Sequence, residues 1–88
     1  MSYELIFLPR ALKAWKKLDS VTRDQFKKKL DERLETPRVP KDALHFKPSH
    51  YKIKLAGKGY RLIYRVDDQR VTVIVIDVGR RDEIYDEI

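Results

Sequence analysis

The chain has 88 residues, enough for one small domain over 1–88 and near the lower end of what folds alone. The absence of cysteine excludes disulfides and thiolate zinc sites, which agrees with a cytoplasmic protein. Twenty Lys and Arg against fourteen Asp and Glu give a net charge of +6, which favours a polyanionic partner, with nucleic acid ahead of an acidic membrane surface. No apolar run approaches membrane-spanning length and no signal peptide is recognisable, so we expect no membrane association.

The N-terminal part predicts a strand followed by two helices. Residues 3–8 are typical of a strand, and the proline that follows suits the first turn of a helix over 9–18. Asp19-Ser20 ends that helix and offers a cap for a second helix, which we expect to run to about Glu35. Because the break between them is so short, the two helices are expected to pack as an antiparallel hairpin.

The remainder predicts a loop and a meander of three strands. Residues 37–50 hold three of the four prolines and are expected to form a loop. Strands follow at 51–55 and 60–66. A turn at 67–69 then leads to a third strand over 70–78, whose apolar character on both faces favours a central position in the sheet.

Gly79 is expected to end the last strand, and the charged tail that follows keeps helical spacing of its apolar residues, which predicts a short C-terminal helix. The fold class is therefore α+β. We expect a single domain of order β-α-α-β-β-β, with the helical hairpin packed on a mainly antiparallel four-stranded sheet.

The first two strands of the meander separate apolar from basic side chains. Both alternate with a period of two, and two glycines between them suit the turn of an antiparallel hairpin. This register sets Leu55 opposite Tyr60 and Lys54 opposite Arg61. Like charges directly opposite each other destabilise a sheet, so the basic face is expected to have a use, with phosphate as its ligand. That face comprises Lys52, Lys54, Arg61 and Arg65. Arg65 alone has aspartates of the next turn as possible ion-pair partners.

The chemistry that this basic face offers is cleavage of RNA without a metal. The sequence has no Gly-rich phosphate loop, no HExxH and no nucleophile elbow, and His45 and His50 lack carboxylate neighbours at ligand spacing, so we expect neither metal nor cofactor. A lysine among other cations loses its proton more readily and can act as a general base toward a ribose 2′-OH. Arginine stabilises a phosphorane-like transition state. Without the usual histidine pair, such a site is expected to be slow on free RNA and to need assistance.

Further basic residues lie outside the hairpin. Arg80-Arg81 follow Gly79, where a loop at the strand end would bring one of them to the basic face, and Tyr85 follows one helical turn later. Lys13, Lys16 and Lys17 are typical of a solvated helix face. If they act, they contact phosphates without reading sequence.

Four segments together resemble the RelE-type toxins of the RelE/ParE superfamily, over nearly the whole chain. Residues 11–18 (ALKAWKKL) resemble the family's first helix and 35–38 (ETPR) its end. The central signature is YKIKL with GYRLIY, and the C-terminal one is VGRR followed by Tyr85. The resemblance implies a RelE/ParE-like, microbial RNase-like fold.

The resemblance also implies an activity: a ribosome-dependent endonuclease that cuts mRNA in the ribosomal A site, leaving a 2′,3′-cyclic phosphate and a 5′-hydroxyl. By position, the resemblance implies that Lys54 is the general base and that Lys52 and Arg61 stabilise the phosphate charge. Arg81 would stabilise or protonate the leaving oxygen, and Tyr85 would orient the nucleotide, stack on it or share the proton transfer. The RNA-binding residues expected beside these are Lys13, Lys16, Lys17, His45, Lys47, Arg65 and Arg80. The implied partners are a RelB-like antitoxin that shifts the C-terminal helix, the ribosome with its rRNA, and operator DNA through the antitoxin complex only.

Two departures and two alternatives accompany this interpretation. His45 stands where the best-known members carry arginine, and the spacing from Arg81 to Tyr85 is two residues shorter than in some relatives. One alternative is a ParE-like inhibitor of DNA gyrase, which shares the fold without the cationic set. The other is a non-catalytic basic module that binds rRNA or DNA.

Overall fold

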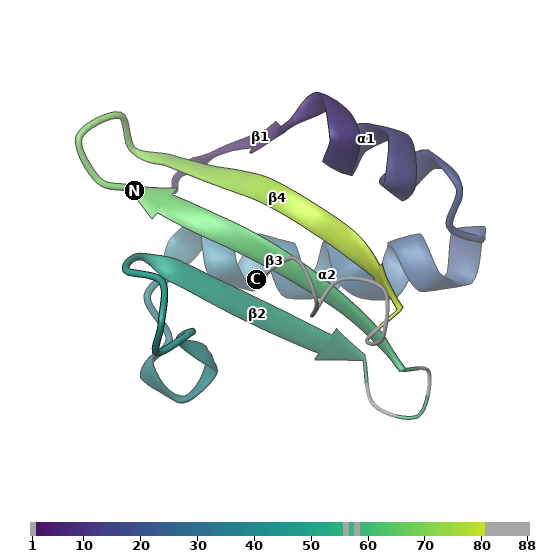
Figure 1. Ribbon diagram of the computed structural model, residues 1–88. Coiled ribbons are helices and arrows are strands. Elements are labelled where there is room, and N and C mark those ends of the chain that lie inside the picture. Colours follow the sequence, from purple (N-terminus) through teal and green to yellow (C-terminus); the bar gives the residue numbers. More distant parts are fainter. Residues whose placement is uncertain (1, 56, 58, 81–88) are drawn as a thin grey trace.

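A computed structural model describes residues 2–55, 57 and 59–80, in which two helices cover one face of a four-stranded sheet (Figure 1). The sheet order is β1-β4-β3-β2, with β1 parallel to β4 and the other neighbours antiparallel. This confirms the predicted α+β class and the central place of the last strand. The elements are β1 (Glu4–Phe7), α1 (Pro9–Lys16), α2 (Ser20–Glu35), the 3-10 turn η1 (Pro40–Asp42), β2 (His50–Leu55), β3 (Tyr60–Asp67) and β4 (Thr72–Arg80).

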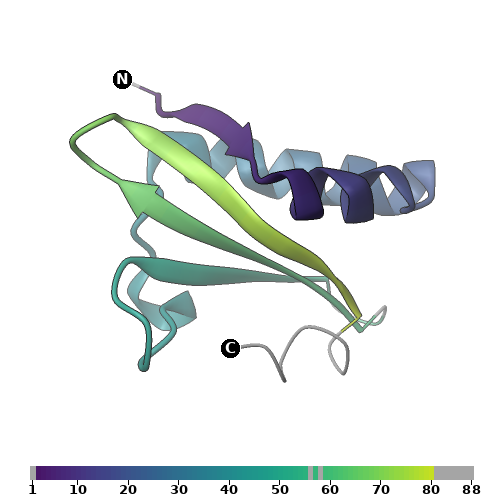
Figure 2. The ribbon, with the colours of Figure 1, turned by 45° about the horizontal axis from the view of Figure 1, so that its top comes forward.

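Local signals fix the two helices. Pro9 occupies the first position of α1, where its missing N–H costs nothing. The Asp19 side chain accepts a hydrogen bond from the Thr22 amide and caps α2, as predicted. At the other end, α2 stops before Pro37. The helices run in opposite directions along the sheet (Figure 2), and none of the helices in the described residues is long and apolar enough to cross a membrane.

The core lies between the helices and one face of the sheet. Phe26 and Leu30 of α2 are almost completely buried, and Trp15 of α1 packs against Phe26 with ring centroids 6.2 Å apart. Alternate residues of the strands meet them, which is the pattern of a sheet with one covered face. The strand residues in this core are Tyr51, Ile53, Leu55, Leu62, Tyr64, Val66, Val73, Val75 and Val78.

The register of the β2–β3 hairpin is the one predicted. Leu55 pairs with Tyr60, and Lys54 pairs with Arg61. The last strand differs, because β4 begins at Thr72 and runs through Gly79 to its end, so the expectation that Gly79 ends it is wrong. A glycine lacks a side chain but keeps its N–H and C=O, and Gly79 stays paired with Arg61 of β3.

A β-bulge in β4 decides which way its last residues point. Tyr64 pairs with Val75 while its neighbour Ile63 pairs with Asp77, so Ile76 is the extra residue. The extra residue reverses the alternation beyond it, since side chains alternate strictly along a regular strand. Val78 therefore points into the core, and Asp77, which an unbroken alternation would bury there, lies on the opposite face.

The predicted loop between α2 and β2 contains more regular structure than its prolines indicated. It contains η1 and an isolated bridge between Ala43 and Tyr51, and β2 takes in His50, which we expected in the loop. Ser49 has φ 64°, the left-handed conformation that the third residue of a tight turn requires.

A buried hydrogen-bond network ties this loop to the core. The Arg33 guanidinium donates to the Tyr64 hydroxyl at 2.8 Å and to the Asp42 carboxylate at 2.6 Å. The Tyr64 hydroxyl donates in turn to the carbonyl of Pro37 at 2.6 Å. Burial opposes the charge of Arg33, but these hydrogen bonds outweigh it and raise the arginine's pKa above its ordinary value. Burial likewise raises the pKa of Tyr64, against the opposing effect of Arg33.

Replacing Arg33→Met tests this network. It leaves the Asp42 carboxylate largely buried without its partner, and we expect the free energy of unfolding to fall by about 3 kcal/mol. Urea titration measures the free energy of unfolding of each variant. Adding Asp42→Leu to Arg33→Met should restore part of the loss, whereas Lys29→Met, an exposed change in the same helix, should stay within about 0.5 kcal/mol. A loss of similar size from Lys29→Met would contradict this account.

A second cluster, on the surface, joins the chain's beginning to the β3–β4 turn. Arg38 pairs with Asp68 at 2.7 Å and donates to the Tyr51 hydroxyl at 3.2 Å, and the Tyr3 hydroxyl donates to Asp68 at 2.7 Å. The hydrogen bonds from Arg38 and Tyr3 lower the pKa of Asp68, and the bond to Asp68 raises the pKa of Tyr3. The aspartate is therefore favoured in its charged form in the folded state.

This lowered pKa predicts a pH dependence for Asp68→Asn. A depressed carboxylate pKa contributes stability above the unfolded pKa of about 4, and the contribution disappears as pH falls through the folded value. The parent should therefore be more stable than Asp68→Asn near neutral pH, and the two should converge in acid. Thermal unfolding from pH 7 downward measures the difference. Asp24→Asn is the matched control, and a difference from Asp68→Asn that persists unchanged in acid would refute the account.

Candidate functional site

The face of the sheet opposite the helices carries the predicted basic cluster. We call Lys52, Lys54, Arg61 and Arg65 the cationic face. Their neighbours along β2 and β3 are buried in the core, except Tyr60, which is partly buried and packs against it. Lys54 is exposed, and the other three cations are partly exposed. The pairing of Lys54 with Arg61 sets two like charges directly opposite each other, as the sequence predicted.

A small apolar cluster lies on the same side of the sheet as these cations. Ile63 of β3 is 1% exposed and Leu44, from the loop before β2, is 7% exposed, with Ile76 packed against them. Ile63 is the register partner of Lys52. The cations therefore border a dry surface, where their interaction with a bound anion is less screened than in open water.

The two aspartates of the β3–β4 turn bind partners other than the cationic face. Within the described part of the chain, the side chains of Lys52, Lys54 and Arg65 form no hydrogen bond or ion pair. Arg65 thus does not pair with the aspartates of the next turn: Asp68 binds Arg38, and Asp67 accepts a hydrogen bond from the Arg70 amide. These three positive charges remain available to an external anion.

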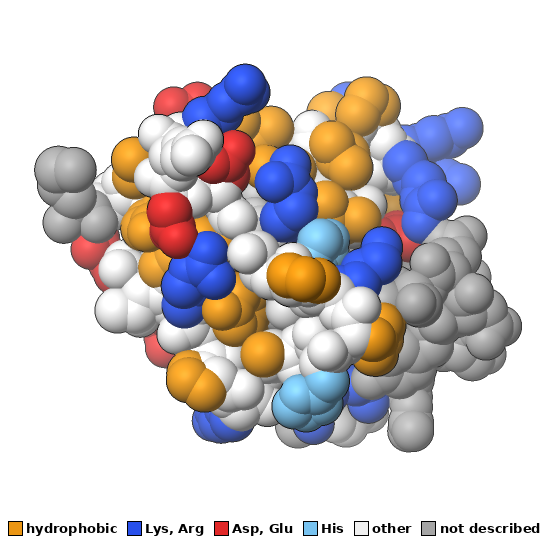
Figure 3. Space-filling model, turned by 60° about the vertical axis from the view of Figure 1, so that its left-hand side comes forward, with side chains coloured by type: hydrophobic (Ala, Val, Ile, Leu, Met, Phe, Trp, Pro, Cys, Tyr) orange, Lys and Arg blue, Asp and Glu red, His pale blue; other side chains and the backbone are white. Residues whose placement is uncertain are grey.

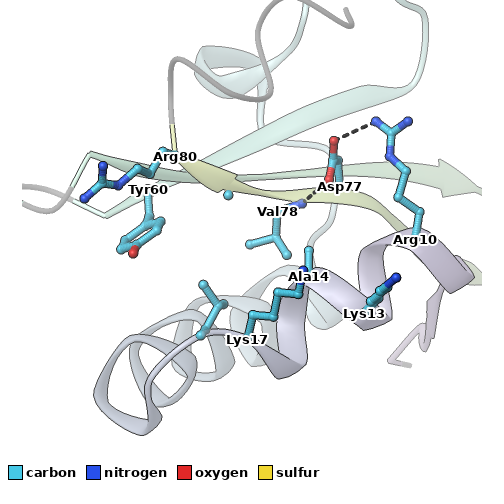
Figure 4. Close-up of a pocket in the computed structure, with 10 residues that line it drawn as sticks. Arg10, Lys13, Ala14, Lys17, Tyr60, Asp77, Val78 and Arg80 are labelled. Atoms are coloured by element: carbon cyan, nitrogen blue, oxygen red, sulfur yellow. Dashed lines mark hydrogen bonds and ion pairs between the residues drawn. The ribbon is translucent and has the colours of Figure 1, made fainter.

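A groove between α1 and β4 forms a second basic region (Figure 4). It exists because β1 is short: Phe7 pairs with Val75, and beyond that point α1 rather than a strand lies beside β4. The groove has a volume of about 830 Å³, within the range of ligand sites. It is lined by Arg10, Lys13, Ala14, Lys17, Leu18, Tyr60, Asp77, Val78, Gly79 and Arg80.

This α1–β4 groove gathers three of the cations that were predicted to contact RNA. Lys13 and Lys17 reach it from α1 and Arg80 from the end of β4, while Lys16 is exposed but does not line it. A loop at the strand end was expected to bring Arg80 or Arg81 to the cationic face; Arg80 does not lie there, and Arg81 lies outside the described residues. Arg80 is still in β4, paired with Tyr60, and the bulge turns it to the helix side of the sheet.

Sequence reasoning missed the ion pair at one end of this groove. Arg10 donates to the Asp77 carboxylate at 2.7 Å, and a second oxygen of Asp77 accepts the Val78 amide at 2.9 Å. The Asp77 side chain is only 12% exposed and needs these partners. The sequence did contain a signal for this ion pair, namely an aspartate within an otherwise apolar strand. In a regular strand Asp77 would lie on the core side without a partner, so an irregularity or a buried cation was to be expected there.

The loop before β2 holds the two remaining candidates at the edge of the cationic face. His45 is exposed and Lys47 is partly exposed, on either side of Phe46. Arg81, Tyr85 and the predicted C-terminal helix lie outside the described residues. Among the described residues no group of three His, Cys, Asp or Glu is arranged to hold a metal ion.

Comparison with known proteins defines the family. The profile of the family described as "ParE toxin of type II toxin-antitoxin system, parDE" matches residues 5–85. The curated "mRNA interferase toxin RelE" of Escherichia coli K12 is 53% identical over 89 residues, which cover 99% of this chain and 94% of that protein. The chain therefore belongs to the RelE/ParE family of toxins from type II toxin-antitoxin systems, as its motifs indicated.

Solved structures agree with this assignment. A chain of the intact E. coli RelBE toxin-antitoxin complex superimposes with a TM-score of 0.88 at 53% identity, covering 90% of this chain and 96% of that one. The isolated E. coli RelE toxin gives a TM-score of 0.88 at 52% identity, covering 98% and 94%. The two-helix, four-stranded architecture is thus shared with RelE over nearly its full length.

Proposed function

We propose that this protein is an mRNA interferase, the toxin of a type II toxin-antitoxin pair, which cuts mRNA in the ribosomal A site. The observation that carries the proposal is the cross-strand pair of Lys54 and Arg61 beside Lys52, on the face of the sheet that the helices leave uncovered. The 53% identity to an E. coli protein named as an mRNA interferase toxin supports the same function.

The reaction needs only groups of the protein and of the RNA. Lys54, in its neutral form, takes the proton from the ribose 2′-OH, and the resulting oxygen attacks the adjacent phosphorus. Lys52 and Arg61 stabilise the charge that develops on the phosphate oxygens. The bond to the 5′-oxygen breaks, and that oxygen takes up one proton, for which the family resemblance implies Arg81 as the donor; the products are a 2′,3′-cyclic phosphate and a 5′-hydroxyl. Arg81 would act at the leaving oxygen and Tyr85 would orient the nucleotide.

The proposal includes dependence on the ribosome. His45 lies in the loop before β2, and His50 begins β2 opposite Arg65, whereas Lys54 and Arg61 pair at the other end of the hairpin. The two histidines therefore do not form the histidine pair of a self-sufficient ribonuclease at Lys54 and Arg61. Lysine and arginine are weaker proton-transfer partners near neutral pH, so the rate must come from the orientation of the mRNA. A ribosome that holds the A-site codon in a fixed conformation supplies that orientation.

The partners follow from the same proposal. E. coli RelE forms a solved complex with its antitoxin, and by family relation the partner here is a RelB-like antitoxin that blocks RNA access. Operator DNA is contacted only through that complex. The site of action is the cytoplasm, where mRNA is translated.

Replacing Arg61→Ala tests the catalytic assignment. Loss of one charged donor to the developing phosphate charge should lower the single-turnover cleavage rate on programmed ribosomes by about 100-fold or more. Lys54→Ala should lower the rate by a similar factor, and Lys54→Arg should not restore it, because arginine keeps its proton. Mapped mRNA ends measure cleavage, and thermal unfolding checks the fold.

The same experiment separates the alternative of gyrase inhibition, which the ParE description of the family keeps in view. Intact mRNA with folded parent protein and programmed ribosomes would overturn the proposal. A DNA supercoiling assay would then be the next measurement.

A charge-reversal pair tests the α1–β4 groove. Lys13→Glu/Lys17→Glu should weaken binding to the ribosome and reduce the slope of log affinity against log salt, because phosphate contacts release counterions. Lys27→Glu/Lys28→Glu on α2 changes the net charge equally and serves as the control. Equal effects of the two pairs on affinity and slope would assign the groove no RNA contact of its own.

A further inference from the structure

The loop before β2 presents an exposed aromatic ring that no step of the proposed reaction uses. Phe46 is 62% exposed, the highest value among the large hydrophobic side chains of the described residues that lie on the surface. Among the residues that the structure describes, the other exposed large apolar side chains, such as Val21 at 55%, lie on α1, on α2, on the edge strand β1 or between β1 and α1, and none lies on the β2–β3 hairpin or its preceding loop. The position of Phe46 relative to the cationic face is therefore informative.

Backbone hydrogen bonds hold Phe46 at the tip of a tight turn. The Lys47 amide donates to the carbonyl of Leu44 at 3.2 Å, so His45 and Phe46 are the two central residues and project outward. The loop closes behind them, because the Leu44 amide donates to the carbonyl of His50 at 2.9 Å. The Phe46 ring is thus carried by a turn whose backbone conformation is fixed by hydrogen bonds.

Leu44 sets this turn against the cationic face. Leu44 packs on Ile63, which is the register partner of Lys52. Phe46 follows Leu44 by two residues in the sequence. At the same end of the hairpin, His50 pairs with Arg65. Both histidines of the chain are visible on this side of the molecule, with hydrophobic and basic side chains among them (Figure 3).

We propose that Phe46 stacks on an unpaired base of the mRNA strand whose phosphate lies on the cationic face. Cations that follow the backbone, with an aromatic ring beside them, are the composition of single-strand nucleic-acid sites. A protein-docking patch would instead be continuously apolar, whereas Phe46 is flanked by His45 and Lys47. The inference rests on the proposed function for the identity of the strand. It adds a positioning residue that the family's cationic motifs do not contain.

A substitution series at Phe46 tests stacking against mere hydrophobicity. Phe46→Ala and Phe46→Leu should raise KM for programmed ribosomes about tenfold with little change in kcat, because the ring touches no reacting atom. Phe46→Trp should restore or improve binding. Val21→Ala is the matched control, and thermal unfolding should show all four variants folded. Activity of Phe46→Leu equal to that of the parent would overturn stacking.

Abasic mRNAs identify the base. If Phe46 stacks on one base near the cut, removing that base should raise KM for the parent but not further for Phe46→Ala, which is the non-additivity expected of two groups in contact. A constant cost of Phe46→Ala at every abasic position would assign the ring to rRNA and overturn the proposal. Weaker antitoxin binding with unchanged cleavage would assign it to the antitoxin and overturn it as well.

Binding of a short single-stranded RNA, followed by fluorescence anisotropy, separates this inference from the proposed function. Weaker binding by Phe46→Ala but not by Val21→Ala supports stacking even if the parent cleaves no mRNA, in which case only the proposed function fails. If Phe46→Ala binds and cleaves as the parent does, stacking fails and the proposed function stands. A parent that neither binds nor cleaves overturns both.

Discussion

The hydrogen bonds of the Tyr64 hydroxyl hold together the elements that form the uncovered face of the sheet. The hydroxyl accepts from Arg33 at the end of α2 and donates to Pro37 at the start of the next loop, while the Tyr64 ring stacks on Tyr51 with centroids 5.6 Å apart. One buried group thus joins helix, loop and both strands of the hairpin. Because β2 enters the sheet from that loop, the network also determines where Lys52 and Lys54 lie.

The two-residue period of a strand lets this hairpin serve two purposes. The same backbone that buries Ile53 and Leu62 against the helices holds Lys54 and Arg61 together in solvent. Apolar burial on one face offsets the repulsion on the other. A bound phosphate would relieve that repulsion, so a ligand can improve a contact that costs stability in the free protein.

The sequence allowed prediction of what local periodicity controls. The bounds of α2 and the pairing of Lys54 with Arg61 follow from capping residues and alternation, both visible over short stretches. The direction of Arg80 does not follow, because one extra residue at Ile76 reverses every side chain beyond it. Nor does the groove beside α1, which depends on β1 ending earlier than β4, a difference in length between strands distant in sequence.

The hydrogen bonds that close the loop before β2 have a consequence for association. Leu44, Lys47, Ser49 and His50 are all engaged through their backbones in the free protein. A surface that is already preorganised loses little conformational entropy when a partner arrives, so more of each contact appears as affinity. The surface that this loop presents is thus shaped by folding, before any partner binds.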